Sequence, residues 1–145
     1  MDARRHCGAD GERASGPDGI LAIVEYVRDQ EGSPIAAALI EFMARYGSDR
    51  AYTPPDYPRE LAETAGFGAS ETFVPPCQLR LELDAFIGLA LSSSHAAGVI
   101  DRLGVDGARS ALRELAMPHR VDDEHVLLGY LFQCFTVHRN ADSGY

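Results

Sequence analysis

Apolar positions along this chain fall into blocks whose spacing predicts strands and helices in turn. The first block is an unbroken apolar run from Ile20 to Tyr26, rich in β-branched residues, which follows the turn signal Gly16-Pro17-Asp18-Gly19. Such a run is typical of a strand covered on both faces, as in helix-covered parallel sheets. Ser33 then predicts the cap of a helix that carries Pro34 in its first turn and ends at Gly47.

The later blocks predict two more strands, with helices before and between them. Apolar residues at helical spacing indicate further helices over residues 58–65, 82–91, 96–103 and 108–116. A short strand is predicted at 71–74, interrupted by Pro75-Pro76, and a long one at 125–139. The alternation of Leu79, Leu81 and Leu83 leaves open an extension of the short strand. We expect the core of the long strand to come from five residues: Leu127, Leu131, Phe132, Phe135 and Val137.

Composition narrows the classes of function. The 145 residues suit one domain, and a net charge of −9 argues against nonspecific binding of nucleic acid, which needs a basic face. All 13 basic residues are arginines, so Schiff-base chemistry and a P-loop are excluded. Cys7, Cys77 and Cys134 are widely spaced, which fits a reducing cytoplasm and indicates neither a disulfide framework nor a zinc site. No apolar run approaches the ~20 residues of a membrane span, so no membrane partner is expected.

Four motifs in order carry a resemblance to a known family. The first strand continues as Leu21-Ala22-Ile23-Val24-Glu25-Tyr26 and is followed by Arg28-Asp29. A short helix ends in Ala65-Gly66-Phe67, a leucine-rich helix leads into Ser92-Ser93-Ser94-His95, and the last strand includes residues 131–139. Over residues 16–139 this pattern resembles the C-terminal half of class I S-adenosylmethionine-dependent methyltransferases of the small-molecule type.

The resemblance implies a fold and a cofactor. The fold would be α/β, a partial Rossmann-like methyltransferase sheet of strands five to seven, with the last strand antiparallel and a helical cover. Residues 19–139 would form this portion, residues 1–18 a disordered leader and residues 140–145 a tail. The cofactor would be S-adenosyl-L-methionine, and its binding residues would lie in an N-terminal half that this chain lacks. The strand at 20–26 would then have an unpaired apolar edge, which predicts marginal stability, a homodimer, or pairing with a complementing N-terminal half.

Two groups of residues are candidates for the substrate pocket, while no catalytic residue is assigned. Glu25 and Tyr26 lie where the end of the first strand would face a small-molecule substrate, although they also fit a plain strand end. Ser92, Ser94 and His95 form the richest polar cluster and would line the acceptor pocket, although serines between helices are common caps.

Two charged clusters are expected to be structural. We expect Arg28-Asp29 to form a structural ion pair or a loop anchor rather than a substrate clamp. Residues 119–125 contain two histidines and three acidic residues, but their polar loop favours solvated surface over a metal site.

Three functions remain open. The first is a truncated methyltransferase acting on a small molecule, incomplete and inactive by itself. The second is a noncatalytic remnant or dimerising α/β binding module with no cofactor, and the third is a small-ligand binding domain of unrelated ancestry. A serine hydrolase is disfavoured because the Gly-x-Ser-x-Gly elbow is absent.

Overall fold

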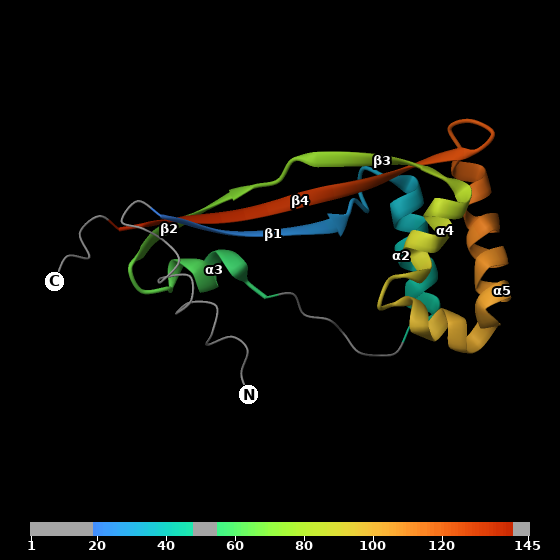
Figure 1. Ribbon diagram of the computed structural model, residues 1–145, viewed down its shortest axis with the longest axis horizontal. Coiled ribbons are helices and arrows are strands. Elements are labelled where there is room, and N and C mark those ends of the chain that lie inside the picture. The colour runs from blue at the N-terminus through green and yellow to red at the C-terminus, as the bar shows by residue number, and fades with distance from the viewer. Residues whose placement is uncertain (1–18, 48–54, 141–145) are drawn as a thin grey trace. The chain divides into compact units, whose positions relative to one another are not determined.

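A computed structural model describes residues 19–47 and 55–140 of the chain (Figure 1). The predicted leader at residues 1–18, most of the loop after Gly47, and residues 141–145 of the predicted tail lie outside the described residues. The elements in chain order are β1 (Ile20–Arg28), α2 (Pro34–Tyr46), α3 (Tyr57–Ala62), β2 (Phe67–Phe73), β3 (Pro76–Glu82), α4 (Leu83–Leu91), α5 (Ala96–Ala116), the 3-10 turn η1 (Met117–His119) and β4 (His125–Arg139).

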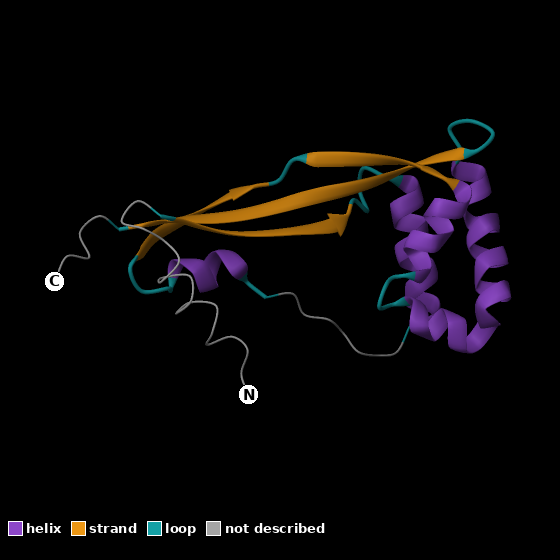
Figure 2. Cartoon of the chain, in the orientation of Figure 1, coloured by secondary structure: helices purple, strands orange, loops and turns teal. Residues whose placement is uncertain are grey.

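The last strand, β4, is the centre of the sheet and runs opposite to its neighbours (Figure 2). It pairs antiparallel with β3 through residues 125–131 and with β2 through residues 134–139. The strand order β1-β4-β2 places β1 on the other edge of β4. There the N–H of Arg139 donates to the carbonyl of Gly19 at 2.9 Å, and that of Asp29 donates to Gly129 at 3.0 Å. The α/β class and the antiparallel last strand are therefore confirmed.

The described residues form two compact units. The first contains residues 19–25, 55–75 and 132–140, and the second contains residues 26–47 and 76–131. Both β1 and β4 contribute residues to each unit.

In the first unit, α3 packs on one face of β1, β4 and β2. Asp56 caps α3 by accepting the N–H of Arg59, and Gly66 turns the chain into β2 with a φ of 84° that suits glycine. Phe67 follows that turn and lies in the buried cluster. The cluster consists of Leu61, Phe67, Phe135 and Val137, with Leu21, Ile23 and Tyr57 against it.

In the second unit, α2, α4 and α5 pack together and against β4. The cap predicted at Ser33 is confirmed, with Pro34 in the first turn and Gly47 at the end of the helix. The buried side chains of α2 fall at helical spacing, which places one face of the helix in the core. The largest fully buried side chains of this unit are Phe86, Leu39, Ile87, Leu112, Leu128, Val99 and Val126.

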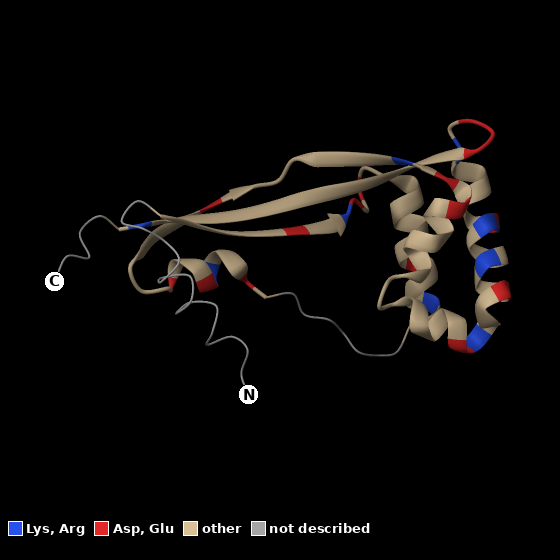
Figure 3. Cartoon of the chain, in the orientation of Figure 1, with Lys and Arg blue, Asp and Glu red and all other residues tan. Residues whose placement is uncertain are grey.

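The long helix α5 contains the break that the sequence predicted at Gly104. This glycine has φ 70° and ψ 169°, which are not helical values, so the helix axis changes direction there. The second half begins directly at Val105 rather than at Ala108. Charged residues of both signs lie along α5 (Figure 3), and Arg113 forms an ion pair with Asp84 of α4 at 2.5 Å.

The prediction that β1 is covered on both faces is wrong for the described residues. Leu21 and Ile23 are half-buried against the first core, whereas Ile20 and Val24 are 56% and 63% exposed. Successive residues of a strand point to opposite faces, and only the face of Leu21 and Ile23 is covered here. The unbroken apolar run therefore reflects one buried and one exposed apolar face.

Two further expectations are corrected. Residues 76–82 form a full strand, β3, so the alternation of Leu79 and Leu81 was the decisive signal. Pro76 begins this strand, and only Val74 and Pro75 separate it from β2. In β4, Phe135 and Val137 are buried as expected, but Leu127 and Leu131 are half-buried and Phe132 is 36% exposed. The strand's period of two instead directs three other residues into the second unit's core: Val126, Leu128 and Tyr130.

Candidate functional site

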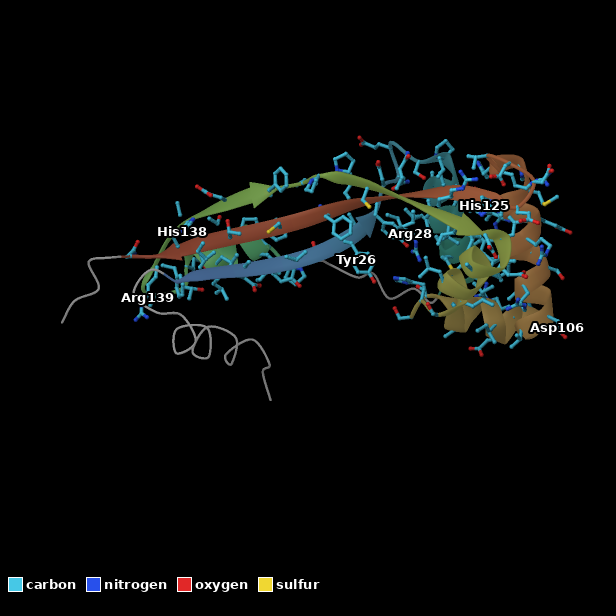
Figure 4. All side chains as sticks on the ribbon, turned by 45° about the horizontal axis from the view of Figure 1, so that its top comes forward. Tyr26, Arg28, Asp106, His125, His138 and Arg139 are labelled. Atoms are coloured by element: carbon cyan, nitrogen blue, oxygen red, sulfur yellow. The ribbon has the colours of Figure 1, made fainter. Side chains whose placement is uncertain are left out.

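Tyr26 and Arg28 lie at the end of β1 in the second unit (Figure 4). Both lie near Tyr130 of β4. The rings of Tyr26 and Tyr130 meet edge to face, with centroids 5.5 Å apart at 76°. The side chain of Arg28 lies close enough to the hydroxyl of Tyr130 to favour its ionised form. Arg28 is half-buried, and its Nε atom is enclosed without a hydrogen-bond partner among the described residues. The site therefore combines a cation with two phenol rings.

Burial sets the ionisation of Tyr130. Only 6% of this residue is exposed, and the loss of hydration raises the pKa of its hydroxyl above the usual 10. The charge of Arg28 acts in the opposite direction but is the smaller effect. Tyr130 is therefore a neutral hydrogen-bonding group at physiological pH, and not a base.

The chain that follows Arg28 is fixed by Asp29 and Ser33. A carboxylate oxygen of Asp29 accepts the N–H of Gly32 at 2.8 Å, and its carbonyl accepts the N–H of Ser33 at 3.0 Å. The buried hydroxyl of Ser33 accepts the N–H of Gly129 at 3.0 Å, which joins the cap of α2 to β4. Asp29 is thus the predicted loop anchor. The alternative of an ion pair is wrong for the described residues, in which no carboxylate pairs with Arg28.

The candidate pair Glu25 and Tyr26 is divided by the two units. Glu25 is half-buried and belongs to the first unit, whereas Tyr26 is 66% exposed and belongs to the second. Because adjacent strand residues face opposite ways, the two side chains do not form one pair at a single face. Of these two candidates, Tyr26 is the one that lies in the Arg28 site.

The second candidate group, Ser92, Ser94 and His95, lies together in the exposed turn between α4 and α5. The hydroxyl of Ser92 donates to the carbonyl of Leu89 at 2.8 Å, and that of Ser93 accepts the N–H of His95 at 3.2 Å. The first bond satisfies a carbonyl in the last turn of α4, and the second lies within the turn, since no side chain caps the start of α5. These local bonds support a structural role for the turn more directly than a pocket lining.

The loop before β4 is organised by Asp122. One of its carboxylate oxygens accepts the N–H groups of Glu124 and His125 at 2.9 and 2.8 Å and lies 2.9 Å from Nδ1 of His125. The other oxygen pairs with Arg80. In the described part of the chain no three histidine, cysteine, aspartate or glutamate side chains converge as a metal site. The cluster around residues 119–125 is a hydrogen-bonded loop.

We expect this loop to lose stability in acid. The N–H of Glu124, followed by the side chain of His125, lowers the pKa of Asp122 from 3.8 to about 2. The hydrogen bonds to the Asp122 carboxylate therefore stabilise the folded chain fully above pH 3.8, which is the pKa of this group in the unfolded chain. This stabilisation is lost as the pH falls through about 2, the pKa in the folded chain. Urea unfolding of the native chain and Asp122→Asn across this range should give stabilities that converge in acid. A difference that does not change with pH would contradict the assignment.

Three of the cavities lined by described residues of the second unit lie away from the Arg28 site. One of about 390 Å³ separates α2 from α5, and one of about 340 Å³ lies beside the Asp84–Arg113 pair. The third, of about 220 Å³, adjoins Ser33 and His119 at the start of α2. Each is open and mixed in polarity, and none gathers a set of catalytic groups.

Sequence reasoning missed Tyr130 and gave Arg28 a structural role. The signal for Tyr130 was available, because a tyrosine in an apolar strand needs a partner for its hydroxyl. Its pairing with Arg28 was not available, because the two residues lie about a hundred positions apart and meet only when β1 pairs with β4.

Comparisons with known proteins add no family assignment. No family model matches this chain. No curated protein matches it either. Within the described residues, no helix is long and apolar enough to cross a membrane.

Proposed function

We propose that this chain supplies the C-terminal strands of a class I S-adenosylmethionine-dependent methyltransferase that acts on a small molecule. The observation that carries the proposal is the sheet order β1-β4-β2, in which the last strand runs antiparallel to both neighbours. The resemblance described above implies a final strand of this kind. In the sequence, the helices α2 and α3 lie between β1 and β2. These two strands are parallel to each other because both run antiparallel to β4, and this arrangement also fits that family.

The unpaired edge of β1 supports the second part of the proposal, an external donor-binding half. β1 ends the strand order, so no described strand pairs with its other edge. Natural edge strands are usually protected by charges, prolines or bulges, but residues 20–24 of β1 are all apolar. Such a strand is built for the interior of a larger sheet. Another segment or chain would provide its neighbour and the residues that hold the methyl donor.

In this assignment the described residues hold the methyl acceptor. S-adenosylmethionine, when bound, supplies an activated methyl group, and the remaining task is to align the acceptor with it. Tyr26, Arg28 and Tyr130 lie at the carboxyl end of β1, the end at which α/β sheets bind ligands. Two phenol rings and a guanidinium can orient a small acceptor there.

A second function is favoured by the exposed side chains of β1. Ile20 and Val24 form an apolar face beside the unpaired strand edge, which also fits a noncatalytic module that dimerises through β1 and binds no cofactor. The two proposals differ in whether a donor site is completed by an external segment.

Calorimetric titration with S-adenosylmethionine distinguishes the two functions. We expect no heat of binding from this chain alone, and saturable heat when the chain is produced together with the segment encoded directly upstream of Met1. S-adenosylhomocysteine, the product form of the donor, serves as the positive control for the completed site. Tight donor binding by the chain alone would overturn the assignment of its strands. A donor-free dimer in both preparations would replace the methyltransferase with the dimerising module.

A further inference from the structure

Arg28 is a cation whose surroundings are incomplete. It is half-buried at the end of β1, its Nε is enclosed without a hydrogen-bond partner, and the described residues place no carboxylate against it. The neighbouring carboxylate of Asp29 instead accepts the N–H of Gly32. Arg28 as a whole is only half-buried, so the unfavourable loss of hydration falls on the enclosed Nε, whose N–H has no acceptor among the described residues. The structure therefore supplies a positive charge that an external anion would satisfy.

The neighbours of Arg28 select among anions. Tyr130 is neutral, and its hydroxyl lies beside the side chain of Arg28. Tyr26 offers an exposed ring held edge to face against Tyr130. A planar guanidinium pairs most specifically with a planar, bidentate group, and a carboxylate is such a group. An aromatic wall beside it favours an anion that has an apolar body.

We propose that Arg28 binds the carboxylate of a small organic acid and that Tyr26 contacts the body of that acid. This proposal rests on the function proposed above, in which the end of β1 holds the methyl acceptor, and it names the acceptor class as carboxylate-bearing molecules. Arg28 is then a residue that binds and orients the acceptor. The reacting atom of the acceptor is not assigned by this contact.

The test uses the whole chain, with benzoate as the probe and benzamide as its neutral isostere. Titrations are followed through the Nε–H resonance of Arg28 in ¹H–¹⁵N spectra, identified by its loss in Arg28→Lys. We expect benzoate to shift this resonance saturably and benzamide to leave it unchanged. Lysine keeps the charge but lacks the bidentate geometry, so Arg28→Lys should weaken benzoate binding, measured by calorimetry, at least about tenfold. Arg109→Lys, at an exposed arginine of α5, should bind benzoate as the native chain does.

Each contrary result overturns a specific part of the proposal. An unshifted resonance, or unchanged affinity in Arg28→Lys, would remove Arg28 as the receptor. An equal shift by benzamide would show that the ring and not the charge is recognised, and an equal response to inorganic phosphate would remove the preference for carboxylates. Benzoate binding requires no methyl donor. If donor binding fails in the titration above while benzoate still binds, the methyltransferase assignment is lost and the carboxylate site remains.

Discussion

Replacing Ile87 with alanine is expected to lower the free energy of unfolding by about 2–5 kcal/mol. Ile87 is wholly buried in α4, within the core shared by α2, α4, α5 and β4. Its truncation removes three carbon atoms from a closely packed interior and leaves a cavity that helices on both sides prevent from closing. Urea unfolding followed by circular dichroism would measure the loss.

Leu89 provides a matched control two residues further along the same helix. It has the same number of side-chain atoms as Ile87 but is 37% exposed. We expect Leu89→Ala to change the stability by less than about 1 kcal/mol, because most of the atoms removed leave no cavity. Equal losses in the two variants would show that α4 does not present the face containing Ile87 to the core.

Replacing Gly98 with alanine is expected to destabilise the chain by about 1–3 kcal/mol, although alanine is the better helix former. A Cβ atom at Gly98 would lie 2.2 Å from the carbonyl oxygen of Tyr46 and 3.1 Å from its carbonyl carbon. These are backbone atoms at the end of α2, so no side-chain rotation relieves the clash. The first turn of α5 would have to move away from α2.

Gly88 gives the opposite expectation for the same substitution. It is exposed in α4, and a Cβ atom there would meet nothing within 4 Å. Gly88→Ala should therefore stabilise the chain by up to about 1 kcal/mol through helix propensity alone. Thermal unfolding of the two variants should shift the midpoint in opposite directions. A stabilised Gly98→Ala variant would contradict the close approach of α5 to the end of α2.

Local signals in the sequence were sufficient for the boundaries of α2 and β4 and for the break in α5. Ser33, Pro34 and Gly47 delimited α2, because capping and chain-stopping depend on residues within one turn of the helix end. Gly104 marked the break in α5 for the same reason, since its positive φ is readily adopted only by glycine. The long strand β4 was predicted with its observed limits, Val126 to Val137 being mostly apolar.

Local signals did not predict which face of each strand is buried. An apolar run such as Ile20 to Tyr26 is compatible with burial on both faces or on one, because the number of covering layers depends on segments distant in the sequence. In β4 the buried side chains belong to even-numbered residues in the second unit, Val126, Leu128 and Tyr130, and to odd-numbered residues in the first, Phe135 and Val137. Whether the even-numbered or the odd-numbered residues are buried depends on where the helices pack, and the hydropathy of the strand alone does not encode it.

The candidate site also combines features that are visible in the sequence with contacts that only the tertiary structure reveals. The residue types at the end of β1, a tyrosine and an arginine before a capped helix, are visible in the sequence. The sequence alone thus determined α2 and its caps, the break in α5, the limits of β4 and the absence of lysine chemistry, all of which are local or compositional properties. Only the tertiary structure decided that Tyr130 meets Arg28, that Asp29 anchors a loop, and that one edge of β1 has no described neighbour. These depend on strand pairing between distant segments, which local spacing does not specify.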